Sequence, residues 1–103
     1  MASKLKVLLV DDHALVRRGF RRMLEDEPTF QVAGEASDGL EAVELAEQLR
    51  PDVIVMDCAL PQMNGIEASR RILAKFPETA ILMLRKQSEA TSSKERRVGK
   101  DCN

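Results

Sequence analysis

Aromatic residues and cysteines are scarce in this sequence. It has no tryptophan, no tyrosine and only three phenylalanines among 103 residues, so it lacks the row of aromatic side chains on which single-strand nucleic-acid binders stack bases. The two cysteines, Cys58 and Cys102, lie in no CxxC pair, which argues against a disulfide scaffold and against structural zinc. The core must therefore be built from aliphatic side chains.

Long apolar runs and a strong net charge are also lacking. The longest uncharged apolar run, residues 80–84, is far shorter than the ~18 residues of a membrane-spanning helix, and the start of the chain lacks an apolar signal segment. Sixteen basic and 17 acidic residues leave a net charge of −1, which argues against a protein that coats nucleic acid or membranes. We expect a cytoplasmic protein with no membrane contact and no direct DNA binding.

The charge balance changes near residue 85. Residues 1–84 hold 10 basic and 14 acidic residues, a net charge of −4, whereas residues 85–103 hold 6 basic and 3 acidic, a net charge of +3. The second stretch has no helical or strand periodicity of apolar residues, so it cannot supply a core face. We predict a folded domain over residues 1–84 and a polar, basic tail over residues 85–103 that is disordered or non-native.

Short apolar runs and helical patterns alternate in the first 84 residues. Residues 5–10 and 52–57 are typical of strands buried on both faces, a weaker, alternating strand is predicted at 30–36, and one more strand is predicted at 80–84. The intervening helices carry apolar residues at helical spacing: Val16, Phe20 and Leu24 with Leu15 and Met23 alongside, then a helix capped by Asp38, then one capped by Asn64. This βαβαβαβ order implies an α/β fold, a parallel sheet with helices on each side.

Three carboxylates fall at strand ends in this arrangement. Asp11 and Asp12 follow the first strand, and Asp57 ends the third. If these strands are neighbours, the carboxylates meet at the carboxyl edge, where open α/β sheets bind ligands. A hard divalent cation with oxygen ligands relieves the repulsion among such groups, and Mg²⁺ is the natural candidate. The alternative is that Asp12 simply caps the first helix.

At these positions the sequence resembles the receiver domain of two-component response regulators, particularly the NarL/FixJ type. The matching segments have the family's spacing and are residues 7–13 (VLLVDDH), 34–39 (GEASDG) and 55–68 (VMDCALPQMNGIEA). The resemblance runs from about Lys4 to Leu84. It implies a flavodoxin-like, doubly wound parallel sheet, the receiver fold.

The resemblance also implies a function. The residue matching Asp57 accepts a phosphoryl group from a sensor histidine kinase, with Mg²⁺ as cofactor. The metal ligands implied are Asp12 directly, Asp11 through water, Asp57 itself and the backbone carbonyl of Ala59. In this subfamily the receiver controls a DNA-binding output domain, which is absent from this chain, and we expect no enzyme activity of its own.

The family pattern stops at Arg85. There the family has a Ser or Thr that contacts the phosphoryl group, then a helix, a fifth strand ending in Lys and a last helix, none of which is identifiable in this chain. We therefore expect an incomplete receiver fold with an exposed edge at the fourth strand, which favours a homodimer or higher association. We also expect weak or absent phosphorylation by acetyl phosphate. A truncated, non-switching fragment that acts only as a binding or dimerisation module stays open as the alternative function.

Two groups of polar residues receive a structural interpretation. We expect His13 to be a first-turn residue rather than a metal ligand, because no cysteine or second histidine accompanies it. The arginines of the first helix are expected to form a solvated face, with docking of a kinase as the alternative: Arg17, Arg18, Arg21 and Arg22.

Overall fold

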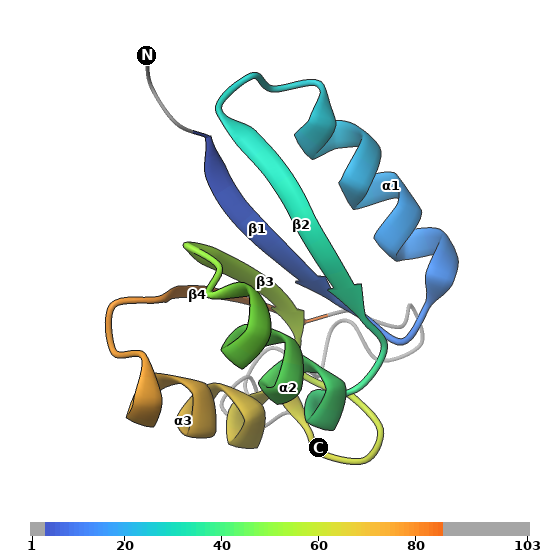
Figure 1. Cartoon of the computed structure of the whole chain (residues 1–103). Helices are drawn as coiled ribbons and strands as arrows, with labels where there is room; N and C mark the ends of the chain where they lie inside the picture. The colour runs from blue at the N-terminus through green and yellow to red at the C-terminus, as the bar shows by residue number, and fades with distance from the viewer. Residues whose placement is uncertain (1–3, 86–103) are drawn as a thin grey trace.

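Four strands and three helices alternate along residues 4–85, which are the residues described by this computed structural model (Figure 1). The strands are β1 (Leu5–Val10), β2 (Phe30–Ala36), β3 (Val53–Asp57) and β4 (Ala80–Leu84), and the helices are α1 (Ala14–Glu25), α2 (Gly39–Leu49) and α3 (Gly65–Lys75). The predicted order is confirmed, and β3 begins one residue later than expected. Apart from Arg85, the predicted tail lies outside the described residues.

The strands form one parallel sheet in the order β2-β1-β3-β4. β1 and β3 are neighbours as expected, with Val10 opposite Met56 at their carboxyl ends. The chain therefore moves outward from β1 in both directions, to β2 on one side and to β3 and β4 on the other. This arrangement is the flavodoxin-like one, and its topological switch point lies between β1 and β3.

Side-chain caps begin α2 and α3 where the sequence predicts them. The carboxylate of Asp38 accepts a hydrogen bond from the Glu41 N–H at 2.8 Å, and the side-chain oxygen of Asn64 accepts one from the Glu67 N–H at 2.9 Å. Each bond satisfies a backbone donor that the first turn of a helix leaves without an intrahelical partner. Both helices consequently start just after a strand or loop at the carboxyl edge of the sheet.

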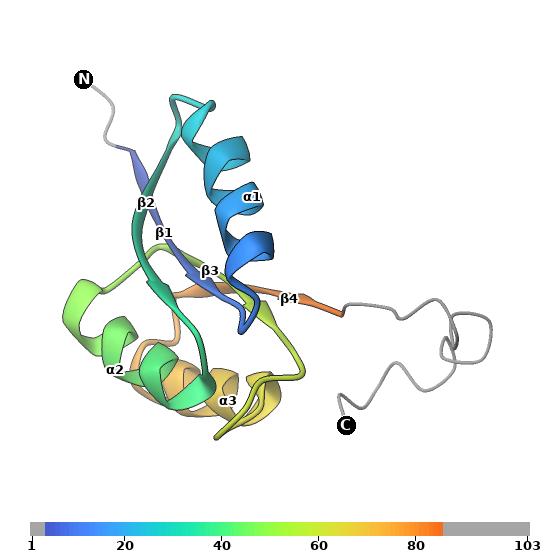
Figure 2. The ribbon, with the colours of Figure 1, turned by 90° about the vertical axis from the view of Figure 1, so that its right-hand side faces the viewer.

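The helices cover opposite faces of the sheet (Figure 2). Leu8 and Val10 of β1 point to the face covered by α2 and α3, where the small residues Ala42, Ala46 and Ala68 are fully buried. Val7 and Leu9 point to the other face, against Phe20 and Leu24 of α1 together with other partly buried residues. The alternation of one strand thus supplies both cores. None of the helices in residues 4–85 has the length and apolarity needed to cross a membrane.

Helix α1 packs along a narrower stripe than its sequence suggests. Phe20 and Leu24 contact the sheet, but Leu15 and Met23, which the sequence places alongside them, are 75% and 60% exposed. The reason is geometric: at about 100° per residue, the positions just before Val16 and Leu24 turn away from a single flat contact face. As a result no residue of α1 is fully buried.

Candidate functional site

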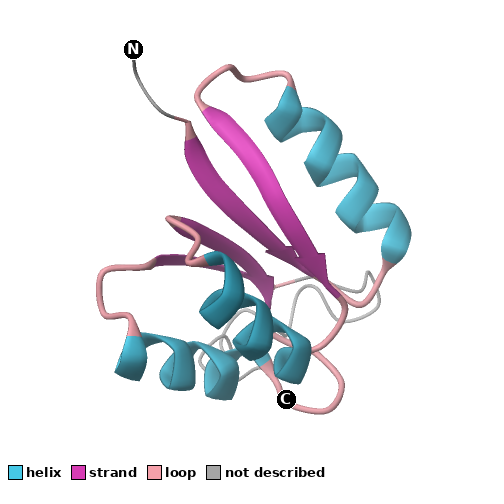
Figure 3. Cartoon of the chain, in the orientation of Figure 1, coloured by secondary structure: helices cyan, strands magenta, loops and turns pink. Residues whose placement is uncertain are grey.

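The carboxyl ends of β1 and β3 bring two buried carboxylates to one edge of the sheet. Asp57 ends β3 and is 1% exposed, and Asp11 follows β1 and is 5% exposed. They directly follow the paired residues Met56 and Val10, so their backbones continue side by side. Figure 3 shows the loops after these two strands leaving the same edge of the sheet. The structure therefore has the predicted neighbouring strands with an aspartate at the end of each.

Asp11 is held by hydrogen bonds on both its backbone and its side chain. Its N–H donates to the carbonyl of Ala36 at 3.1 Å, and its carbonyl accepts from Nη1 of Arg17 at 2.6 Å. Its carboxylate oxygen Oδ1 accepts the His13 N–H at 2.8 Å, which closes a tight turn at the corner between β1 and α1. These bonds fix both the backbone position of Asp11 and one orientation of its carboxylate.

Asp12 and His13 complete an acidic corner with Asp11. The side chain of Asp12 is 33% exposed, and Nδ1 of His13 lies 3.1 Å from Oδ1 of Asp12 and 3.3 Å from Oδ1 of Asp11. The three residues each offer a ligand atom, and these atoms lie within 4.8 Å of one another. Asp57 is not in that group, so the ligand set of Asp11, Asp12, Asp57 and the Ala59 carbonyl stays a prediction.

The residue that begins the first helix differs from what was expected, both for Asp12 as a possible cap and for His13 as a first-turn residue. His13 is the N-cap residue of α1, with an extended backbone and no capping hydrogen bond from its side chain. The alternative that Asp12 caps this helix is therefore wrong, and His13 precedes the first turn rather than lying in it. The sequence signal that could have placed His13 at the acidic corner is its position directly after the two aspartates.

The loop between β3 and α3 closes tightly over Asp57. The Ala59 N–H donates to Oδ1 of Asp57 at 3.3 Å, and the Gly65 N–H donates to the Cys58 carbonyl at 2.8 Å. A Cβ atom on Gly65 would lie 2.5 Å from the Asp57 carbonyl oxygen, closer than a side chain allows. Gly65 is thus required for the start of α3 to approach the end of β3.

β4 borders the site on its other side. Asp57 is paired with Leu84, and the Leu84 carbonyl accepts the Cys58 N–H at 3.0 Å. The chain therefore leaves the sheet at the same edge as Asp57, and Arg85, the next residue, is exposed. Arg85 is thus the first residue after β4, at the carboxyl edge where β3 ends in Asp57.

A network of two arginines and one glutamate links α1 to β2. Nε of Arg17 donates to Oε1 of Glu35 at 2.9 Å, and Nη1 of Arg21 donates to the other oxygen, Oε2. Hydrogen bonds from Arg17 and then Arg21 hold the pKa of the Glu35 carboxyl below its usual value, against the opposing effect of partial burial. The same kind of contact, first with Glu25 and then with Glu35, raises the pKa of Arg21.

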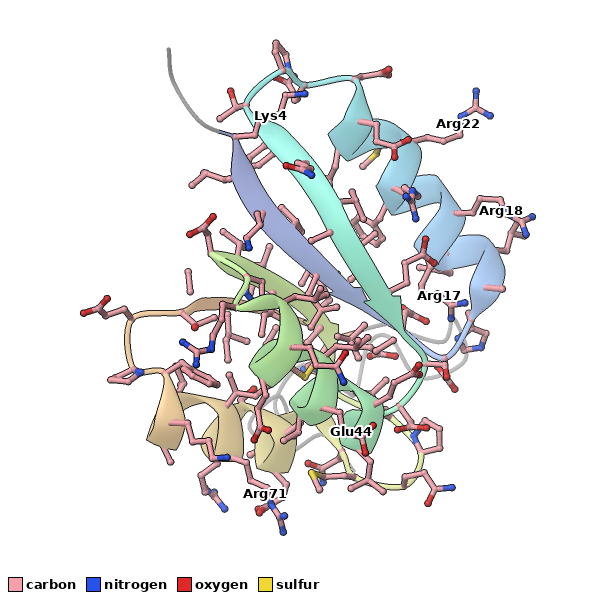
Figure 4. The ribbon with its side chains drawn as sticks, viewed as in Figure 1. Lys4, Arg17, Arg18, Arg22, Glu44 and Arg71 are labelled. Carbon is pink, nitrogen blue, oxygen red and sulfur yellow. The ribbon has the colours of Figure 1, made fainter. Side chains whose placement is uncertain are left out.

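The solvated face predicted for α1 is therefore only half correct. Arg18 and Arg22 are exposed and extend outward from the helix, whereas Arg17 lies between α1 and the end of β2 (Figure 4). The side chain of Arg17 is 19% exposed and that of Arg21 is 40% exposed. Sequence reasoning missed this network, although the alternation of helix faces separates Arg17 and Arg21, four residues apart, from Arg18 and Arg22.

Comparisons with known proteins agree with this geometry. The family model for the response regulator receiver domain matches residues 7–99, so the likeness to the family extends beyond Leu84, where the resemblance was expected to end. The transcriptional regulatory protein DegU of Brevibacillus brevis is 43% identical over 82 residues, which are 80% of this chain and 35% of that protein. A protein-glutamate methylesterase/protein-glutamine glutaminase of Pyrococcus horikoshii is 41% identical over 83 residues, 81% of this chain and 23% of that protein.

Solved structures show the same likeness. A two-component response regulator of the LuxR family from an Aurantimonas species superposes on this chain with a TM-score of 0.77 at 40% identity. The superposition covers 94% of this chain and 70% of that one. The chain spans only about a third or less of the length of the two relatives above. Those relatives have different names as whole proteins, a transcriptional regulator and an enzyme, so the shared segment does not by itself carry either activity to this chain.

Proposed function

The chain belongs to the family of response regulator receiver domains, and we propose on this basis that Asp57 accepts a phosphoryl group from a sensor histidine kinase. The observation that carries the proposal is the burial of the Asp57 carboxylate at the end of β3, next to the corner formed by Asp11 and Asp12. In a site of this kind, catalysis depends mainly on the positions of the groups and on neutralisation of the phosphoryl oxygens. We therefore consider the other residues of the site for how they position Asp57 and how they could hold a cation that neutralises the phosphoryl oxygens.

Mg²⁺ fits the donors present at this edge. Asp11, Asp12 and Asp57 offer carboxylate oxygens and Ala59 offers a backbone carbonyl, and oxygen is the ligand atom that Mg²⁺ prefers. We assign these four residues as those that would hold the ion. When bound, Mg²⁺ would supply positive charge that offsets the negative charge of the phosphoryl oxygens.

The transfer step uses the Asp57 carboxylate as nucleophile. One carboxylate oxygen forms a bond to phosphorus while the bond between phosphorus and the donor atom breaks, and the donor leaves with that electron pair. The product is a mixed anhydride on Asp57. The Ala59 N–H, which donates to Oδ1 of Asp57 at 3.3 Å, helps to hold the orientation of the carboxylate.

The wider role follows the family. We propose that this receiver acts in the cytoplasm and that phosphorylation of Asp57 controls a DNA-binding output domain in the longer protein to which such receivers belong. Arg85 stands where the family has a hydroxyl, at the end of β4 beside the residue that follows Asp57. We expect this replacement to slow phosphorylation and to weaken its transmission, because a guanidinium can pair with phosphate oxygens but cannot make the hydroxyl's contact.

Intact mass spectrometry after incubation with acetyl phosphate and Mg²⁺ tests the phosphoacceptor. We expect a slow gain of one phosphoryl group that is lost in Asp57→Asn. Asp52→Asn is the matched control, because Asp52 lies next to the opposite end of β3 and is exposed. If Asp57→Asn gains the adduct as readily as wild type does, Asp57 is not the acceptor. If wild type gains no adduct at all, the replacement of the family's hydroxyl by Arg85 has abolished phosphoryl acceptance by this chain. A module that only binds or dimerises would then be the better description.

A further inference from the structure

We propose that Arg17 is a positioning residue for cation binding at the acidic corner and that Glu35 holds it in place. The inference rests on the proposed function, since it concerns the Mg²⁺ site of that proposal. It assigns a role to a side chain that lies outside the predicted ligand set. The geometry that carries it is one guanidinium joining the end of β1 to the end of β2.

Arg17 makes two different hydrogen bonds with its planar guanidinium. Nη1 donates to the Asp11 carbonyl at 2.6 Å, and Nε donates to Oε1 of Glu35 at 2.9 Å. Its side chain is 19% exposed and that of Glu35 is 26% exposed, so solvent screens this pair less than a surface ion pair. Two bonds in different directions from a rigid group fix the guanidinium and, through it, the backbone at Asp11.

A bulge in β2 brings Glu35 to this position. Val7 is paired with Val32, but Leu8 is paired with Gly34, so Ala33 is an extra residue on β2. Before the bulge, Phe30 and Val32 face α1, whereas after it Ala36 belongs to the core under α2 and α3. Because strand side chains alternate, Glu35 then faces α1, where the two arginines contact it.

The Asp11 backbone is the link from this pair to the cation. The carbonyl that Arg17 holds belongs to the residue whose Oδ1 accepts the His13 N–H and whose carboxylate is a predicted metal ligand. Without Arg17, the carbonyl at this corner loses a charged donor and the carboxylate loses part of its support. Without Glu35, the Arg17 guanidinium has no carboxylate partner on β2. It can then turn toward the carboxylates of Asp11 and Asp12, where its positive charge competes with the cation. Groups that orient metal ligands typically change metal affinity about 10-fold or more when removed.

Arg21 provides a matched control. It donates to Oε2 of the same Glu35 and also pairs with Glu25, one turn along α1. Unlike Arg17, it has no hydrogen bond to Asp11 among the bonds of residues 4–85. Arg17→Gln and Arg21→Gln therefore each remove one arginine bond to Glu35, but only Arg17→Gln removes the bond to the acidic corner.

Calorimetric titration of the 103-residue chain with Mg²⁺ tests the inference. We expect Arg17→Gln to weaken Mg²⁺ binding about 10-fold, Arg17→Lys to recover part of the loss, and Arg21→Gln to stay within about twofold of wild type. Amide hydrogen exchange should show faster exchange of the His13 N–H in Arg17→Gln but not in Arg21→Gln. A thermal melt of each variant verifies that it is folded, and Glu35→Gln, which keeps both arginines, replaces Arg17→Gln if that variant unfolds.

The possible outcomes separate the two proposals. If wild type and Arg17→Gln bind Mg²⁺ equally, or if Arg21→Gln weakens binding as much as Arg17→Gln does, the positioning role is wrong and the phosphoacceptor proposal stands. If wild type binds no Mg²⁺ at millimolar concentration, the proposed metal site is wrong and the positioning role falls with it. A loss confined to Arg17→Gln and Glu35→Gln supports the inference.

Discussion

The two faces of the sheet are packed in different ways. Under α2 and α3, ten residues form one buried cluster, and small residues such as Ala42 and Ala68 let the helices approach closely. Under α1, the buried cluster within residues 4–85 consists of Val7, Leu9 and Val55, and a cavity of about 10 Å³ remains beside Leu9 and Val55. Helix α1 is also joined to the sheet by the Arg17 and Arg21 bonds to Glu35.

This difference indicates a division of roles. The face under α2 and α3 gains its stability from buried apolar area, which contains no titratable group and is not weakened by salt screening. The face under α1 depends in part on charged hydrogen bonds, which are weakened by acid and by salt. The second face also contacts the acidic corner, through Arg17 and the Asp11 carbonyl. The face under α1 therefore contacts the site through charged hydrogen bonds, whereas the face under α2 and α3 contacts it through the close approach of Gly65 to Asp57.

Two adjacent leucines of β1 offer the strongest test of the comparison. Leu8 and Leu9 are of one residue type, 0% and 2% exposed, and point to opposite faces. We expect Leu8→Ala to lower the free energy of unfolding by about 3–5 kcal/mol and Leu9→Ala by about 2–3 kcal/mol, because the looser α1 face can shift to fill part of the space. Urea unfolding followed by circular dichroism measures both. Equal losses would show that the two faces are packed equally well.

Two glycines give the next largest contrast. Gly65→Ala places a Cβ 2.5 Å from the Asp57 carbonyl oxygen, and we expect it to cost about 2–3 kcal/mol of stability and to disturb the phosphoacceptor. Gly19→Ala is the control, since no atom outside its two chain neighbours and the backbone of α1 lies within 4 Å of the added Cβ. There we expect a gain of about 0.5–1 kcal/mol, from the higher helix propensity of alanine. A stable Gly65→Ala protein with unchanged chemistry at Asp57 would contradict the tight closure described above.

Acid should weaken the α1 face selectively. The pKa of Glu35 is lowered in the folded protein, so its contribution is present above its ordinary pKa of 4.5 and is lost as the pH falls below that value. We expect Glu35→Gln to cost about 1–2 kcal/mol at neutral pH, with the difference from wild type shrinking below pH 4.5 and in high salt. Urea unfolding at several pH values measures this. A difference that stays constant down to low pH would mean that the Glu35 charge does not stabilise α1.

The smallest expected effect on stability concerns β4. Leu82 is 55% exposed, whereas Ile81 and Met83 on the same strand pack against the core under α2 and α3. We expect Leu82→Ser to change the free energy of unfolding by less than about 0.5 kcal/mol but to reduce association of the chain at high concentration. Sedimentation velocity measures the association, with Leu40→Ser on α2, another exposed leucine at 46%, as the control. Equal association of both variants and wild type would show that β4 is not the contact surface.

Much of the fold was predictable because it depends on short stretches of sequence. The buried strands, the caps at Asp38 and Asn64 and the order of elements each depend on residues within one window of periodicity or one turn. The meeting of Asp11 and Asp57 at one edge was predicted on the condition that β1 and β3 are neighbours, and the structure pairs these two strands. The sequence alone therefore located the candidate site.

Other features were decided only by the tertiary structure. The exposure of Leu15 and Met23 depends on how much of α1 the sheet can contact, and helical spacing does not report the width of that contact. The contact between Arg17 and Glu35 depends on the bulge at Ala33, which arises where β2 pairs with a strand distant in sequence. Periodicity within β2 cannot reveal such a shift in register, because a shift of one residue reverses the face of every side chain that follows it. The sequence by itself thus determined which elements form and where the acidic residues gather, and the pairing of the strands decided which charged side chains support them.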